Sequence, residues 1–161
     1  MIIRNVKLTD APSIASIYNY YVENSVITFE EETITFQQME KRIENISNNY
    51  PYLVIEDSNE LIGYAYATRW KERSAYKYSA EVSIYLNHNR TGSGAGTMLF
   101  SKLLDELKQT QVHSLVGGIA LPNDASIKLH EKFGFRKIAQ FEQIGFKFNQ
   151  WIDVGYWQLI V

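Results

Sequence analysis

The chain has 161 residues, of which 45% are hydrophobic, and a formal net charge of −2; this predicts one domain, residues 1–161, with a well-formed core. The chain has no excess of basic residues that would attract nucleic acid or an anionic membrane. No signal peptide or membrane-spanning apolar run is recognisable. Cysteine is absent, which excludes disulfides and thiolate chemistry, so we expect a cytoplasmic protein with small-molecule ligands.

The N-terminal part of the chain predicts a strand followed by two helices. Residues 2–8 alternate in polarity as a strand does, and residues 9–24 have the apolar spacing of a helix. The cap of that helix is expected at Thr9 or Asp10. Residues 35–50 predict a second helix with one apolar face.

The centre of the chain predicts a hairpin, a further strand and a helix. Two apolar stretches flank the polar pair Ser58-Asn59, which is typical of a hairpin turn. Residues 79–86 alternate as a strand, and a helix with one apolar side is expected from about Thr97 to Gln109.

The C-terminal part predicts one strand, one helix and two final strands. Residues 114–121 form a continuous apolar run, which is typical of the centre of a sheet. Residues 123–135 predict a capped helix that Gly134 ends, and residues 136–161 predict two strands. The order β-α-α-β-β-β-α-β-α-β-β indicates one mixed α/β layered domain.

A glycine-rich loop joins the strand at 79–86 to the following helix, in the stretch EVSIYLNHNRTGSGAGTMLF. It is not a P-loop, because it ends Gly-Thr-Met where Gly-Lys-Ser/Thr is required. A dinucleotide site would normally follow the first strand and have an acidic residue about 20 positions on, where Leu115 and Val116 stand. Two alternatives remain: Gly92, Gly94 and Gly96 bring main-chain N–H groups close to a phosphate, or they only form a tight turn.

The loop resembles the acetyl-CoA-binding motif Gln/Arg-x-x-Gly-x-Gly/Ala of the GCN5-related N-acetyltransferases (GNAT), with Thr91 in place of Gln or Arg and Arg90 one residue earlier. The segments WKERSAYKYSAEVSIYL, IALPNDASIKLHEKFGF and GFKFNQWIDVGYWQL resemble the phosphinothricin and methionine sulfoximine acetyltransferases of that family. The resemblance covers nearly the whole chain. It implies the α/β GNAT fold, with a mixed central sheet of about seven strands, helices on both faces, and acetyl-CoA in a cleft between central strands.

The resemblance also implies which residues bind acetyl-CoA as co-substrate. They belong to one strand, the glycine loop and the start of a later helix: Ile84, Tyr85, Leu86, Gly92, Ser93, Gly94, Ala95, Gly96, Thr97 and Asn123. Ordinary core packing is an alternative for Ile84 and Leu86, and a helix N-cap is an alternative for Asn123. The three histidines have no metal-ligand spacing, so no metal is expected.

Acetyl transfer to an amine needs a base, because the amine of an amino acid is mostly protonated at neutral pH. Glu81 falls where the resembled enzymes have their catalytic glutamate, and partial burial would raise its pKa. His130 is a second catalytic candidate, which could assist protonation of the leaving thiolate. The alternatives are a solvated glutamate at a strand end and a packed histidine.

An amino-acid substrate brings a carboxylate, so fixed cations are expected near Glu81. The implied substrate-binding residues come from the segment before that strand, from the strand itself and from an earlier loop: Lys71, Glu72, Arg73, Val82, Ser83 and Phe29. A solvated charged loop remains the alternative for the first three.

The expected function is acetylation of the α-amine of a glutamate-like amino acid or analogue (phosphinothricin, methionine sulfoximine or sulfone) by direct transfer. A non-catalytic acyl-CoA sensor and a protein N-terminal or lysine acetyltransferase are the alternatives. The resemblance implies a homodimer, for which the aromatic tail GFKFNQWIDVGYWQL would supply an interface unless its residues are core strands.

Overall fold

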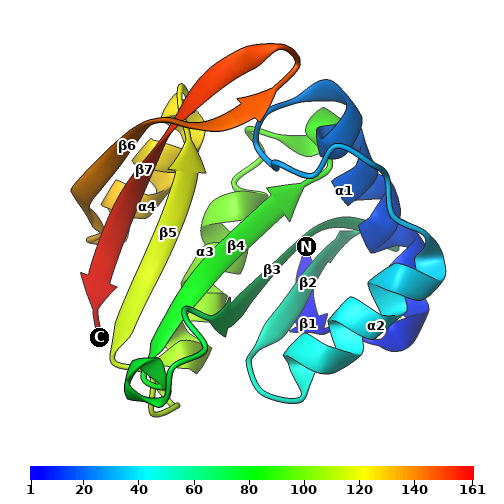
Figure 1. Ribbon diagram of the computed structural model, residues 1–161. Coiled ribbons are helices and arrows are strands. Elements are labelled where there is room, and N and C mark those ends of the chain that lie inside the picture. Colours follow the sequence, from blue (N-terminus) through cyan, green and yellow to red (C-terminus); the bar gives the residue numbers. More distant parts are fainter.

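The computed structural model describes all residues, 1–161, as one seven-stranded sheet with helices on both faces (Figure 1). The strand order is β1-β2-β3-β4-β5-β7-β6, and all neighbouring strands are antiparallel except β4 and β5. The strands are β1 (Ile2–Asn5), β2 (Tyr52–Asp57), β3 (Glu60–Arg69), β4 (Ser79–Leu86), β5 (Ser114–Ala120), β6 (Arg136–Lys147) and β7 (Gln150–Ile160). The helices are α1 (Ala11–Asn24), α2 (Phe36–Ser47), α3 (Ala95–Leu107) and α4 (Asp124–Lys132), with short 3-10 turns at Leu8–Asp10, Ser74–Tyr76 and His88–Arg90.

Each face of the sheet has its own apolar core. Helices α1 and α2 pack on one face around Ile14, Ile43 and Tyr64. Helix α3 packs on the opposite face through Leu99 and Leu103, and α4 adds partly buried apolar residues there. The apolar spacing of each helix therefore faces the sheet, as the periodicity predicts.

The predicted element order and the mixed α/β class are confirmed, and the differences concern element ends. The first strand ends at Asn5, because the chain then turns through a 3-10 helix before α1. The Asp10 side chain does not cap α1: it accepts hydrogen bonds from the Lys7 N–H and from Arg4. Helix α3 begins at Ala95, two residues earlier than expected, immediately after Gly94.

The opening that positions the site lies between β4 and β5. Their parallel pairing covers only Ser79 to Glu81 on β4, opposite Ser114 to Val116 on β5. Beyond Glu81 both strands continue without pairing to each other, and Figure 1 shows β4 and β5 diverging toward their C-terminal ends. Main-chain groups at the centre of the sheet are therefore left for a ligand.

No helix of the chain combines the length and the apolarity that crossing a lipid bilayer requires. No group of three or more histidine and carboxylate side chains is arranged to hold a metal ion.

Candidate active site

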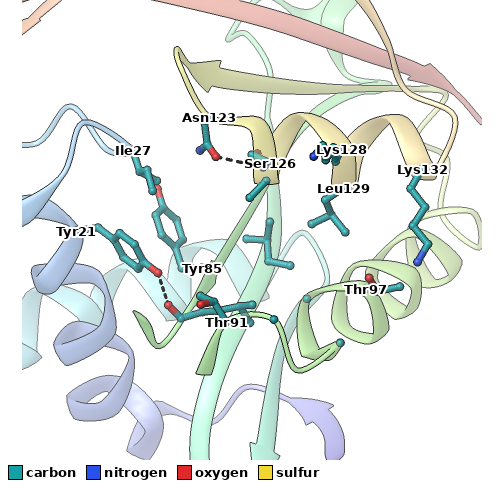
Figure 2. Close-up of a pocket in the computed structure, with 16 residues that line it drawn as sticks. Tyr21, Ile27, Tyr85, Thr91, Thr97, Asn123, Ser126, Lys128, Leu129 and Lys132 are labelled. Carbon is teal, nitrogen blue, oxygen red and sulfur yellow. Dashed lines mark hydrogen bonds between the residues drawn. The ribbon is translucent and has the colours of Figure 1, made fainter. Parts of the chain in front are cut away.

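A cavity of about 570 Å³ lies between the end of β4, the glycine loop and α4 (Figure 2). Its wall contains most of the residues that the resemblance assigns to acetyl-CoA. The full lining is Tyr21, Ile27, Ile84, Tyr85, Leu86, Thr91, Gly92, Gly94, Gly96, Thr97, Asn123, Ala125, Ser126, Lys128, Leu129 and Lys132.

The glycine loop has the conformation of an anion cradle. Gly92 and Gly94 have φ angles of 78° and 84°, in the left-handed region that favours glycine. A Cβ at either position would meet no atom within 4 Å, so neither glycine is required by close packing, and both line the cavity. Gly94 is the N-cap of α3 and supplies no side-chain cap, so the first N–H groups of α3 are free for a ligand.

Two predicted loop residues contribute no side chain to the cavity wall. The Ser93 hydroxyl donates to the C=O of Arg90 over 2.9 Å, which stabilises the loop itself. Ala95 is fully buried in the core at the start of α3. Any contact of these two residues with a phosphate would have to be made by the main chain.

Arg90 does not substitute for the missing cation at position 91. Its guanidinium pairs with Glu60 at 2.9 Å and with Asp57 at 3.7 Å, on the turn between β2 and β3. Thr91 lines the cavity in its place. The loop therefore faces the cavity with main-chain groups and no positive side chain.

The main chain of β4 presents alternate residues to the opening. The N–H of Asn87, directly after β4, bonds to Ile62 of β3. Because main-chain direction alternates along a strand, Tyr85 also points toward β3, and Ile84 and Leu86 point toward the opening. Of the three residues of β4 expected to bind acetyl-CoA, Ile84 therefore offers its N–H and C=O and Leu86 offers its N–H, because the Leu86 C=O accepts from the Tyr21 hydroxyl. Tyr85 also lines the cavity.

The facing edge of β5 is open in the same way. The N–H of Leu121, directly after β5, bonds to Asp153 in β7. Alternation then turns the main-chain groups of Gly118 and Ala120 toward β4. A chain-like ligand lying between β4 and β5 can thus bond to both strands, as an added strand would.

Helix α4 forms the opposite wall of the cavity. Ala125, Lys128, Leu129 and Lys132 lie on it at helical spacing and all line the cavity. Asn123 is the N-cap, with Oδ1 accepting from the Ser126 N–H over 3.2 Å. The cap role is thus observed, and the Asn123 side chain still lines the cavity with its amide nitrogen free of that bond.

Glu81 lies at the last paired position of β4, where the two strands begin to part. A Cβ on Gly118 of β5 would lie 3.2 Å from the Glu81 carboxylate, so the absent side chain leaves room for it. Burial raises the pKa of Glu81, and the ammonium group of Lys71 partly opposes this. A half-buried carboxylate with a raised pKa at a ligand-sized opening has the properties of a general base.

His130 lies on the other face of β5. Its imidazole is 4% exposed and packs against Phe100 and Phe135, and a Cβ on Gly117 would lie 2.6 Å from it. Nδ1 donates to the Ser126 C=O over 2.8 Å, which leaves Nε2 without a proton. Burial lowers the pKa of His130, although that hydrogen bond partly opposes the change.

A neutral imidazole with a bare Nε2 can accept a proton there but has none to donate. His130 could therefore protonate a thiolate only after taking up a proton at Nε2, and its catalytic role stays a prediction. His130 nevertheless lines a hollow of about 60 Å³ between β4 and β5, together with Val82, Ser83 and Gly118. Glu81 directly precedes Val82 on β4 but lines neither this hollow nor the large cavity. The two predicted substrate residues on β4 are thus placed at the opening.

Comparison with known proteins decides the family. The family model described as an acetyltransferase (GNAT) domain matches residues 3–155. The chain belongs to the GNAT acetyltransferase family. It is 35% identical over 156 residues to the phosphinothricin N-acetyltransferase of Streptomyces viridochromogenes, covering 97% of this chain and 85% of that protein. It is 34% identical over 160 residues to the L-methionine sulfoximine/L-methionine sulfone acetyltransferase of Salmonella typhimurium, covering 99% of this chain and 94% of that protein.

Solved GNAT structures have the same architecture. A phosphinothricin acetyltransferase from Sinorhizobium meliloti in complex with acetyl-CoA superposes with a TM-score of 0.96 at 33% identity, covering 99% of this chain and 88% of that one. A protein from Brucella melitensis described as a ribosomal-protein-alanine N-acetyltransferase superposes with a TM-score of 0.98 at 32% identity, covering both chains completely. This GNAT protein is accordingly an acetyl-CoA-dependent N-acetyltransferase, and its resemblance to the phosphinothricin and methionine sulfoximine enzymes is confirmed.

The predicted charged substrate residues of this GNAT protein lie outside the cavity. Lys71, Glu72 and Arg73 are exposed in the segment between β3 and β4. Lys71 lies over the Trp70 ring, 4.9 Å from its centroid, and is the one whose charge acts on Glu81. Glu72 is 3.8 Å from Arg69, and Arg73 precedes the 3-10 turn.

Phe29 belongs to the loop between α1 and α2, which contacts the β6–β7 hairpin (Figure 1). Phe29 faces Gly145 of β6, where an added Cβ would collide with its ring. Lys147 of β6 is almost fully buried and donates to the Thr28 C=O over 2.8 Å. The loop places Ile27, and not Phe29, on the cavity wall.

Several cavity residues were not predicted from the sequence. Tyr21 donates from its hydroxyl to the Leu86 C=O over 2.5 Å, and so lies across the end of β4 (Figure 2). The stripe on α4 could have been found, because four of the five α4 residues that line the cavity repeat at the spacing of one helix face once Asn123 is taken as a contact. Nothing local in the sequence signals Tyr21 or Ile27, since α1 and its loop reach the cavity only through the tertiary fold.

Proposed function

We propose that this N-acetyltransferase acetylates the α-amine of a glutamate-like amino acid, or of an analogue such as phosphinothricin, methionine sulfoximine or methionine sulfone, by direct transfer with Glu81 as general base. The observation that carries this proposal is the Glu81 carboxylate. It lies where β4 and β5 part, has a raised pKa, and forms no salt bridge or side-chain hydrogen bond. A carboxylate free of protein partners can take up a proton during the reaction.

The proposed reaction needs two contributions from the chain: a base and a hydrogen-bond donor for the carbonyl oxygen. Glu81 takes the proton from the substrate ammonium group, directly or through a water, and the amine nitrogen then attacks the thioester carbonyl carbon. A main-chain N–H at the opening, such as that of Ile84, stabilises the charge that develops on the carbonyl oxygen. The C–N bond forms and the C–S bond breaks. The nitrogen then gives up its second proton to solvent and becomes the neutral amide, the leaving thiolate takes up a proton from solvent, and Glu81 returns its proton to solvent, so that one proton is released overall.

We assign the coenzyme to the 570 Å³ cavity and the acceptor to the opposite side of the opening. The glycine loop and Asn123 face the coenzyme, whereas Ser83 and Glu81 lie toward the acceptor. Lys71 and Arg73 remain the candidate cations for an acceptor carboxylate, because they precede β4 on the side of Glu81. The Streptomyces and Salmonella relatives, both named for acetylation of amino-acid analogues, support this substrate class.

A second candidate is acetylation of a protein N-terminus. It is favoured by the close superposition with the Brucella protein described as a ribosomal-protein-alanine N-acetyltransferase. The contact between the loop at residues 25–35 and the β6–β7 hairpin argues against it. The hydrogen bond from Lys147 to Thr28 joins this loop to β6, and a polypeptide acceptor would have to pass between the two. A non-catalytic sensor would have no use for the Glu81 carboxylate.

A thiol-release assay with acetyl-CoA tests the proposal against a panel of amines. The panel contains phosphinothricin, methionine sulfoximine, methionine sulfone, glutamate, and a peptide with an N-terminal alanine. We expect the highest kcat/KM with an amino-acid analogue. Preference for the peptide would overturn the small-molecule assignment, and no turnover with any amine would favour the sensor.

We also propose a homodimer that buries the β6–β7 hairpin. The C-terminal tail is divided: Ile152, Val154 and Trp157 are core residues, whereas Phe146 and Trp151 are 51% and 65% exposed and form an aromatic pair. Exposed apolar patches of this kind mark interfaces. Light scattering of the wild type should give twice the 18.6 kDa chain mass, and Trp151→Glu should give a monomer; a monomeric wild type would contradict the proposal.

A further inference from the structure

The charge on the cavity wall differs in sign from the charge of the protein. The chain has 18 acidic and 16 basic residues apart from histidine. The cavity lining contains no aspartate, glutamate or arginine, and its only charged side chains are Lys128 and Lys132 of α4. A positive wall in a net negative protein favours an anionic ligand at that place.

Neither lysine takes part in a salt bridge. By contrast, Lys102 of α3 and Lys108, the C-cap of that helix, pair with acidic neighbours at 3.4 and 3.6 Å. The ammonium groups of Lys128 and Lys132 are therefore not neutralised by the protein. They are available to a ligand at the cost of little desolvation, because both side chains are exposed.

The position of these lysines is complementary to the glycine loop. They lie one helical turn apart on α4, and α4 forms the wall opposite Gly92 and Gly94. Figure 2 shows Lys132 extending from the end of α4 toward the first turn of α3, where Thr97 lies. An anion held by the free N–H groups of that turn would thus be within reach of an ammonium group from across the cavity.

The loop itself lacks a cation. Thr91 stands at the first position of the motif, and Arg90 is paired with Glu60 and Asp57. We propose that Lys128 and Lys132 bind the phosphate groups of coenzyme A across the cavity and supply the positive charge that this glycine loop does not have. The inference rests on the cavity being the coenzyme site.

Donors that lack one or all of the phosphates of coenzyme A test this proposal. Steady-state kinetics are measured with acetyl-CoA, with acetyl-3′-dephospho-CoA, and with S-acetyl-N-acetylcysteamine, which has no phosphate. The variants are Lys128→Met, Lys132→Met and the double variant, since methionine keeps most of the apolar stem. Lys108→Met at the C-cap of α3 is the matched control, because it removes an exposed lysine that does not line the cavity.

We expect each single variant to raise KM for acetyl-CoA by about threefold to tenfold, with kcat unchanged. The kcat/KM for S-acetyl-N-acetylcysteamine should stay at the wild-type value in every variant. A lysine that binds the 3′-phosphate should lose its effect when acetyl-3′-dephospho-CoA is the donor. Adding Thr91→Arg to the double variant should recover part of the lost affinity, because it restores a cation at the motif.

Two results would overturn the proposal: an unchanged KM for acetyl-CoA in the double variant, or an equal loss with the donor that has no phosphate. Gly94→Ala separates this failure from a wrong coenzyme site. If Gly94→Ala weakens acetyl-CoA binding and the double lysine variant does not, the site stands and the lysine assignment is wrong. If neither change has an effect, the cavity is not the coenzyme site and both assignments are wrong.

Discussion

The two ends of strand β4 contribute to the site in different ways. At its C-terminal end, residues 84–97 pass without interruption from strand to glycine loop to helix, and most of them line one cavity. At its N-terminal end, Lys71 and Arg73 are exposed on a separate segment and line neither that cavity nor the hollow beside Glu81. The coenzyme end depends on main-chain geometry within one short stretch, whereas the acceptor end depends on side chains that several distant segments bring together.

This difference has a consequence for specificity. Main-chain N–H groups bind a phosphate whatever the neighbouring side chains are, so many sequences can build the coenzyme end. An acceptor is distinguished by a few side chains, and each of these can change without disturbing the fold. The GNAT family can therefore keep its donor while its members differ in the amine that they acetylate.

The largest expected effect lies between the two ends, at Glu81. Glu81→Gln keeps the size of the side chain but cannot take up a proton, so kcat should fall by roughly 10² to 10⁴ while affinity for acetyl-CoA stays at the wild-type value. Raising the pH supplies free amine from solution, and the variant should then regain relative activity. Rapid kinetics over a pH series measure both effects, with Glu40→Gln on α2 as control; wild-type kcat at neutral pH would exclude Glu81 as base.

The next effect concerns the coenzyme end. A Cβ at Gly94 would project into the space assigned to a phosphate, so Gly94→Ala should raise the dissociation constant for acetyl-CoA by about tenfold or more. Gly134 also has a positive φ, 89°, at the end of α4 and outside the cavity. Gly134→Ala therefore introduces the same backbone strain of about 1–2 kcal/mol without obstructing the ligand. Calorimetry should show weakened binding only for Gly94→Ala; equal affinities would remove the cradle assignment.

The acceptor end should respond more weakly and selectively. Arg73→Ala should raise KM for an amine that has a carboxylate by about threefold to tenfold and leave KM for acetyl-CoA unchanged. Equal shifts in both constants would show that Arg73 does not contact the acceptor.

A substitution at Lys71 tests whether its charge affects the pKa of Glu81. Its ammonium group lowers the pKa of Glu81, against the effect of burial. Lys71→Met should therefore raise the pKa of Glu81 further. Because the base acts when deprotonated, the acid limb of the kcat/KM profile should move to higher pH; a shift to lower pH, or none, would contradict the coupling.

The smallest effect separates the two roles of Asn123. Asn123→Ala removes the N-cap of α4 and should cost about 1 kcal/mol, or roughly 2–4 °C in Tm. Asn123→Ser retains a cap but removes the amide nitrogen, so its Tm should stay close to the wild-type value. If the free amide nitrogen contacts the coenzyme, both variants should raise KM for acetyl-CoA; a rise in the alanine variant alone would leave Asn123 with the cap role only.

Much of the coenzyme end could be predicted because its signals are local. The glycines of residues 92–96 stand out because Gly92 and Gly94 adopt a positive φ that depends only on their own backbone. Glu81, on the preceding strand β4, was selected through the family resemblance. The periodicity of α4 likewise determines that Lys128 and Lys132 share a face. The hollow between β4 and β5 has no comparable local signal, because Ile27, Ser83 and Gly118 approach it from three separate elements.

The sequence by itself determined the order of elements and the apolar face of each helix, since hydrophobic spacing acts over a few residues. It located the glycine loop but left a phosphate cradle and a tight turn as alternatives. Only the tertiary structure decided that β4 and β5 part after Glu81, that β7 lies between β5 and β6, and that α4 places its lysines opposite the loop. A hydrophobic pattern specifies that a face is buried but not which surface covers it. The partner of each face, and hence the cavity, is decided by contacts between residues that are far apart in the chain.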